Sequence, residues 1–189
     1  MGKLAIFLFL FTLLLGAFLY ALLLQEPVQP KTSQAPQLYP HVRADDLGKT
    51  PGKLQEKYPN LFLSQDRNGL MVGQHKFDNA QYIIWFVLEN KDYRAFRIKA
   101  SRTYSKLEDK EMLSYFGSLY GRPFDAVCRG NTTVARQSCH YKWWVKDRVS
   151  LDVLTREKSD KSISLDAITT DSYLSTKHHN AIRRLLPAQ

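Results

Sequence analysis

The chain has 189 residues, of which 44% are hydrophobic and 24% are charged, and 27 Lys and Arg against 18 Asp and Glu give a formal net charge of +9. This length allows one domain of ordinary size with a single buried core. The composition is that of an ordinary globular protein, which excludes a fibrous or wholly disordered chain.

The first feature in the chain is an uncharged, apolar segment over residues 4–24. A helix rises about 1.5 Å per residue, so this segment is long enough to cross the ~30 Å hydrocarbon core of a bilayer. We therefore expect a single transmembrane signal-anchor helix, which includes Leu4, Phe9, Leu15 and Leu24.

A cleavable signal peptide is the alternative for the same segment. Signal peptides usually have an apolar region of about 7–15 residues followed by small residues at the cleavage site. This run is longer, and Leu19 stands two positions before Ala21, where a small residue would be needed. Only residues 1–3 precede the span, and Lys3 with the amino terminus should keep this tail in the cytoplasm. The sequence therefore predicts a single-pass protein of the bacterial inner membrane, with its C-terminal domain in the periplasm.

Proline distribution divides the rest of the chain into two parts. Six of the eight prolines fall within residues 25–60, among polar side chains. This composition favours an extended, semi-rigid linker. We expect a proline-rich tether over residues 25–60, with a short turn or helix within 41–59, and a folded extracytoplasmic domain over 61–189.

Alternation of apolar and polar residues dominates the expected domain. Residues 81–89 form an apolar run that is typical of a central strand. In residues 93–104 apolar side chains alternate with polar, mostly basic ones, which predicts one packed face and one wet, positive face: Phe96, Ile98 and Ala100 against Arg97, Lys99 and Ser101. Shorter strand candidates lie at residues 70–72, 124–128, 139–146, 149–156 and 162–168.

Two helices complete the predicted fold. A capping box at Ser105 and Glu108 begins a helix over about residues 105–120, which Gly121 and Pro123 end. A second helix is expected from Asp171 onward. The predicted fold class is α+β: an antiparallel sheet of about five to seven strands with one central helix and a C-terminal helix, preceded by the single transmembrane helix.

The two cysteines, Cys128 and Cys139, are predicted to form a disulfide that closes a local loop. An oxidising compartment would let this pair form and stabilise the domain by roughly 3 kcal/mol. The alternative is that Cys139 is a nucleophile beside His140. Adjacent residues on a strand point to opposite faces, so this pair is poorly placed for proton transfer. Asn131-Thr132-Thr133 between the cysteines is a glycosylation sequon, which matters only in a eukaryotic source.

Sequence motifs for catalysis are missing. None of the five histidines has the spacing of a metal ligand, and the segment from Gly117 to Gly121 places its serine one position too early for a nucleophile elbow. We expect no enzyme activity, no metal and no cofactor.

Positive charge is the remaining signal. Basic residues and a tryptophan cluster around one predicted hairpin and form a candidate interaction surface: Lys142, Trp144, Lys146, Arg148, Arg156 and Lys158. The alternative is a solvated strand face that serves solubility. Outside the cytoplasm a nucleic acid is not the expected partner, whereas a protein, anionic lipid or envelope polymer is.

Taken together, these features predict a membrane-anchored, non-catalytic interaction or accessory protein of a cell-envelope complex. The layout of tail, anchor, tether and compact domain is similar to that of accessory subunits of bacterial envelope machines. Two alternatives remain open: an immunity-type or inhibitor-type protein that neutralises a toxin or hydrolase, with the loop between the cysteines as an inserted finger, and an envelope hydrolase.

Overall fold

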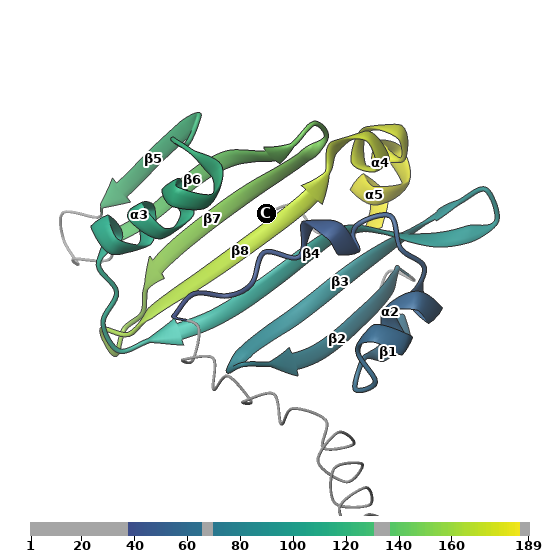
Figure 1. Ribbon diagram of the computed structural model, residues 1–189, viewed down its shortest axis with the longest axis horizontal. Helices are drawn as coiled ribbons and strands as arrows, with labels where there is room; N and C mark the ends of the chain where they lie inside the picture. The colour runs from purple at the N-terminus through teal and green to yellow at the C-terminus, as the bar shows by residue number, and fades with distance from the viewer. Residues whose placement is uncertain (1–37, 66–69, 131–136, 186–189) are drawn as a thin grey trace, which may run out of the picture. The chain divides into compact units, whose positions relative to one another are not determined.

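The domain is built on one antiparallel sheet of eight strands (Figure 1). The computed structural model describes residues 38–65, 70–130 and 137–185. The strand order is β1-β2-β3-β4-β8-β7-β6-β5. The bounds are β1 Phe62–Gln65, β2 Met71–Phe77, β3 Ala80–Glu89, β4 Asp92–Tyr104, β5 Asp125–Gly130, β6 Gln137–Lys146, β7 Val149–Glu157 and β8 Ile163–Asp171.

The helices are short and few beside this sheet. They are the 3-10 turn η1 Ala44–Asp46 and the helices α2 Pro51–Lys57, α3 Asp109–Tyr120, α4 Ser172–Lys177 and α5 His179–Leu185. The predicted fold class is therefore wrong: the domain is mostly β, with eight strands instead of five to seven. The C-terminal helix that was expected from Asp171 onward is two short helices, α4 and α5.

The membrane-spanning part of the predicted fold class is not supported either. No helix among the described residues is long and apolar enough to cross a bilayer. The anchor predicted at residues 4–24 lies outside the described residues, as do the tail at 1–3 and the tether up to residue 37.

The sheet consists of two halves with the same order of elements. Each half begins with a helix, α2 or α3, and continues as a four-stranded antiparallel meander, β1 to β4 or β5 to β8. The last strands of the halves, β4 and β8, pair antiparallel in the middle of the sheet, from Arg97↔Thr170 to Tyr104↔Ile163. The two meanders are therefore related by an approximate twofold axis between β4 and β8, although the sequence contains no visible repeat.

One face of the sheet, called the covered face below, carries the core. Leu54 of α2 packs with Ile84 and Ile98 on the first half, while Met112 and Phe116 of α3 pack with Trp143 and Leu151 on the second half. Met112 and Phe116 are four residues apart, so they lie on one side of α3. Each such buried side chain stabilises the fold by about 1.5–3 kcal/mol.

Residues 38–50 form a strap that also lies on the covered face. Tyr104 Oη donates a hydrogen bond to the Leu38 carbonyl at 2.7 Å. Farther along, Gly48 N donates to the Ala95 carbonyl at 2.7 Å, and Ala95 N donates to the Lys49 carbonyl at 3.0 Å. Figure 1 shows this strap, in purple and blue, running over the central strands toward α2. Residues 38–60, which fall within the predicted tether, thus pack against the sheet.

Candidate functional site

The opposite face of the sheet, called the open face below, is the main candidate site. Strand pairing aligns its side chains in rows across the sheet, and one row runs Ile83, Lys99, Ile168, Asp152 and Lys142. The helices α2 and α3 pack on the covered face, so they leave this row uncovered.

The helices α4 and α5 close one end of the open face. Leu174 of α4 and Ile182 of α5 form a buried cluster with Val87 and Phe96, and Trp85 packs against this cluster. Trp85 and Val87 are two residues apart on β3, so their side chains share the open face. The open face therefore has a wall at the end where Trp85 lies.

A shallow hollow of about 830 Å³ occupies the open face and reaches from β3 to β5. Its apolar lining consists of Ile83, Trp85, Val127, Leu154 and Ile168. Four cationic side chains and one carboxylate join them: Arg97, Lys99, Arg129, Arg156 and Asp166. The hollow is thus both apolar and positively charged.

Arg97 is the most unusual residue of the hollow. Its Nε is buried and has no hydrogen-bond partner within the described part of the chain. Burial lowers the pKa of the Arg97 guanidinium, and the Asp152 carboxylate opposes that shift. An arginine stays protonated in proteins, so Arg97 presents a positive charge whose donors the described residues leave partly unused.

The other charged groups on the central strands of the open face are paired. Lys99 Nζ lies 3.0 Å from Asp166 Oδ2, and His140 Nε2 lies 2.7 Å from Asp152 Oδ1. Lys142 Nζ is 3.9 Å from the same Asp152 oxygen. These pairs orient the side chains of the central strands and reduce the free positive charge there.

The pairing of His140 with Asp152 has the form of a general base held by a carboxylate. Nucleophilic catalysis would also need a hydroxyl or thiol within hydrogen-bond reach of the imidazole. His140 makes no hydrogen bond to a serine, threonine or cysteine side chain in residues 38–65, 70–130 and 137–185. The same residues contain no group of His, Cys, Asp and Glu that could hold a metal ion.

The predicted interaction surface is divided between different parts of the fold. Lys142, Trp144 and Arg156 lie on the open face, because their cross-strand partners are Asp152, Ser150 and Ser138 or Ser164. Trp144 is 55% exposed and stacks on Phe124, with ring centres 5.4 Å apart.

The other three predicted residues do not line the hollow. Lys146 Nζ forms an ion pair with Asp45 Oδ1 at 2.7 Å, and Lys158 Nζ donates to Thr103 Oγ1 at 3.1 Å. Arg148 lies in the turn between β6 and β7, with its guanidinium carbon 5.3 Å from the Tyr173 ring centre.

The sequence-based interaction surface included one residue of the hollow, Arg156, and missed most of the others. Arg97 and Lys99 stood in a strand whose polar face was predicted to be wet and positive, so one signal was present. The sequence contained no signal for Leu154 and Ile168, because these residues come close to Arg97 only through the pairing of β4 with β8 and of β8 with β7.

Cys128 and Cys139 form the predicted disulfide, which joins β5 to β6 at directly opposed positions. Residues 131–136 of the loop between them lie outside the described residues, and so does the sequon at Asn131.

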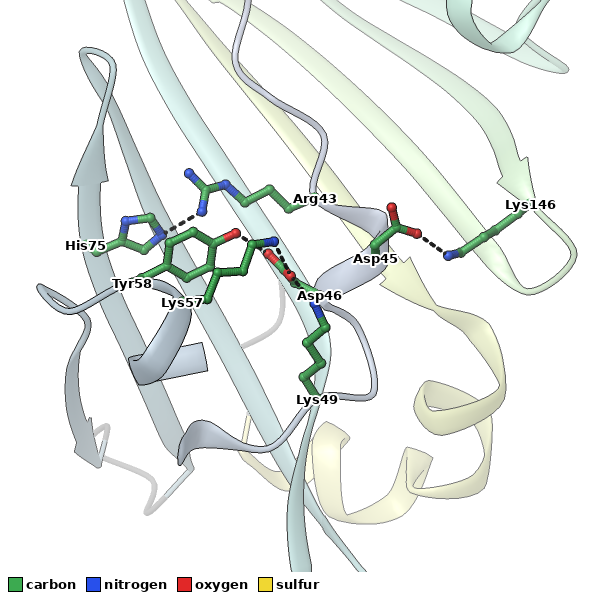
Figure 2. Close-up of polar contacts among 8 residues, drawn as sticks. All are labelled: Arg43, Asp45, Asp46, Lys49, Lys57, Tyr58, His75 and Lys146. Carbon is green, nitrogen blue, oxygen red and sulfur yellow. Dashed lines mark hydrogen bonds and ion pairs between the residues drawn. The ribbon is translucent and has the colours of Figure 1, made fainter. Parts of the chain in front are cut away.

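A second polar cluster lies on the covered face and fastens the strap (Figure 2). Asp46 is fully buried, and its carboxylate accepts hydrogen bonds from Lys49 at 2.8 Å, Lys57 at 2.7 Å and the Tyr58 hydroxyl at 2.5 Å. Burial alone would raise the pKa of Asp46, but these hydrogen bonds outweigh it and hold the pKa below its ordinary value.

Beside Asp46, an arginine and a histidine stack with aromatic rings. The Arg43 guanidinium carbon lies 4.2 Å from the Tyr58 ring centre and 4.0 Å from that of Tyr82. His75 stacks between the same two rings, and Arg43 Nη1 lies 3.4 Å from its Nε2. Burial, assisted by the charge of Arg43, lowers the pKa of His75 to about 4, so a neutral imidazole accepts from the guanidinium at neutral pH. Each group of this cluster has a partner, which identifies it as a fastening for the strap.

Comparison with known proteins does not identify a family. No protein-family model matches the chain, and no curated protein matches it. A crystal structure of PA94, a protein of unknown function from Pseudomonas aeruginosa described as a candidate regulator, is similar at 13% sequence identity. The match covers 69% of this chain and 99% of that chain, with a TM-score of 0.33, and a likeness of this degree supports no inference.

Proposed function

We propose that this protein is a non-catalytic binding protein that holds a polypeptide partner against the open face of its sheet. The observation that carries the proposal is the uncovered hollow, where apolar and cationic side chains lie together on six strands. Contiguous exposed apolar surface with a polar rim is typical of a site for another macromolecule.

The shape of the hollow supports a polypeptide partner over a small ligand. Small molecules bind in concave pockets that bury most of their surface. Neighbouring strands lie about 4.8 Å apart, so a hollow across six strands is about 24 Å wide. This width suits a helix or an extended segment that lies across the sheet.

The Cys128–Cys139 disulfide supports a place of action outside the cytoplasm, since such bonds persist in oxidising compartments. A cell-envelope complex is the setting that we infer from this. The inhibitor alternative depends on the loop between the cysteines, most of which lies outside the described residues, so no observation favours it.

The experiment compares partner capture by the full-length chain and by two leucine variants in the source cells, after cross-linking. Leu154→Glu places a charge in the hollow, while the matched control Leu119→Glu changes an exposed leucine on α3. We expect a partner that the wild-type chain and Leu119→Glu both recover and that Leu154→Glu loses. Binding must then be reproduced with the purified partner.

The proposal fails if every recovered protein is captured equally by Leu154→Glu. It also fails if the captured partner, once purified, binds the two variants with the same affinity.

A further inference from the structure

The cations of the hollow form two separate groups with unused donors. At one end, Arg97 has its buried Nε without a partner among the described residues. At the other end, Arg156 on β7 and Arg129 on β5 both lie opposite Ser138 of β6. Within the described part of the chain neither Arg129 nor Arg156 forms an ion pair, whereas Lys99 and Lys142 both do.

Strand register gives the spacing between these groups. Arg156 pairs with Ser164 of β8, and Ser164 pairs with Thr103 of β4. Thr103 and Arg97 are six residues apart on β4, which is about 20 Å at ~3.4 Å per residue. The two cationic groups therefore lie about 20 Å apart along the strands.

Apolar side chains occupy the space between the two groups. Ile83 and Ile168 lie in the row next to Arg97, and Leu154 lies in the following row toward Arg156. A ligand that reaches both ends can therefore place apolar groups on these three side chains and anionic groups at its ends, while the Lys99–Asp166 ion pair lies beside its middle.

We propose that the partner segment held on the open face is an apolar stretch of polypeptide flanked at both ends by acidic side chains. This inference rests on the proposed function and names the chemistry of its partner. One carboxylate pairs with Arg97, and a carboxylate at the other end pairs with Arg129 and Arg156. A guanidinium can bind a carboxylate through two parallel hydrogen bonds.

The pattern of the face distinguishes this partner from a lipid chain. Lys99 and Asp152 stand beside Ile168 in the central row, one on each side. An acyl chain along this row would lie over charged groups that it cannot bond, and leaving such groups unbonded is unfavourable. A polypeptide brings backbone and side-chain polar groups to the same places.

The test measures binding of synthetic peptides to the purified full-length chain by fluorescence anisotropy. The first peptide has about 14 residues, with two glutamates at each end of a leucine and alanine middle, so that as a helix it spans about 20 Å. A second peptide replaces the glutamates with glutamines. Vesicles of phosphatidylcholine, with and without phosphatidylglycerol, provide the lipid comparison.

We expect the glutamate peptide to bind at least about tenfold more tightly than the glutamine peptide, as for a charged hydrogen bond. Arg97→Gln should remove most of this difference, and Arg97→Lys should restore part of it. Arg122→Gln, which removes an exposed arginine outside the hollow, should leave binding unchanged. Thermal unfolding of each variant shows whether it is folded.

Each contrary outcome has a definite meaning. Equal binding of the two peptides, lost for both in Leu154→Glu, refutes the acidic partner and leaves the proposed function standing. Failure of both peptides to bind, or binding that Leu154→Glu does not weaken, refutes the proposed function as well. Preference for phosphatidylglycerol vesicles that depends on Arg97 would assign the hollow to lipid and overturn the polypeptide.

Discussion

Replacing Arg97 by methionine should stabilise the folded domain, because the buried guanidinium of this arginine destabilises the fold. Its Nε is buried and has no hydrogen-bond partner among the described residues, and such a donor destabilises the fold by about 1–3 kcal/mol. Methionine has similar length, needs no hydrogen bond and can contact Trp85 and Ile168 beside it.

The expected gain is near the lower end of that range. Attraction between Arg97 and Asp152 is lost in the variant, and the Nε is the one guanidinium nitrogen that is buried without a partner among the described residues. We therefore expect the free energy of unfolding to rise by about 1 kcal/mol, or the melting temperature by roughly 2–4 °C.

The assay is urea denaturation of the full-length chain at pH 7, followed by circular dichroism. Arg122→Met is the matched control, because Arg122 is exposed and should change the free energy of unfolding by less than about 0.5 kcal/mol. A loss of more than about 1 kcal/mol in Arg97→Met would refute the reasoning, since Arg97 would then be held by favourable contacts. Together with weaker binding of the glutamate peptide, a gain would show that the arginine is present for binding and not for folding.

Three further predictions concern the covered face and the disulfide. The lowered pKa of His75, about 4 against 6.5, means that the unfolded state binds the proton first as the pH falls, so stability should fall between pH 6.5 and 4. His75→Phe should reduce the dependence of the free energy of unfolding on pH by up to about 1.4 kcal/mol per pH unit, as measured by urea denaturation at each pH. An unchanged pH dependence would contradict the burial of a neutral imidazole. Replacing Cys128 and Cys139 by serine should lower the free energy of unfolding by about 2–3 kcal/mol, and thiol titration of the unfolded wild-type chain should find no free thiol. Phe116→Ala should destabilise the domain by about 3–5 kcal/mol against less than about 0.5 for the exposed Leu119→Ala, and similar melting temperatures for the two would place Phe116 outside the core.

Local sequence patterns predicted the strands and the helix in which buried and exposed side chains alternate regularly along the element. The apolar run at residues 81–89 is β3, and the alternation at 93–104 is β4. Both strands bury every second side chain for most of their length, so the signal survives in the sequence. The helix expected over 105–120 lies at Asp109–Tyr120, where Met112 and Phe116 provide its buried side.

Edge elements could not be predicted in the same way. Strand β1 has only four residues, and none of them is buried, so no alternation marks it. It lies beside β2 at one edge of the sheet, and its neighbours in the chain include helix α2, which falls within the proline-rich region. Helix α2 itself lies within residues 41–59, where a short turn or helix was expected, and proline stands at its first position.

The candidate site could not be predicted for a different reason, because its residues lie far apart in the sequence. Arg97 and Leu154 belong to one hollow because β4 pairs with β8, some seventy residues later in the chain, and β8 pairs with β7. No local pattern contains that pairing. The approximate twofold arrangement explains the pairing of β4 with β8. Each half ends in a strand that has unpaired backbone N–H and C=O groups along one edge, and the pairing of β4 with β8 gives both edges their hydrogen bonds.

The same arrangement explains why the open face is available for binding. Each half contributes one helix, α2 or α3, to the covered face, and the strap also lies on that face. Of the helices in the described part of the chain, only α4 and α5 lie on the other face, and these cover the end at Trp85. Apolar residues such as Ile168 and Leu154 therefore remain partly exposed beside arginines that the fold does not neutralise. In a protein that binds nothing on this face, polar and ion-paired residues would be expected at these positions. We therefore infer that a second molecule covers the open face.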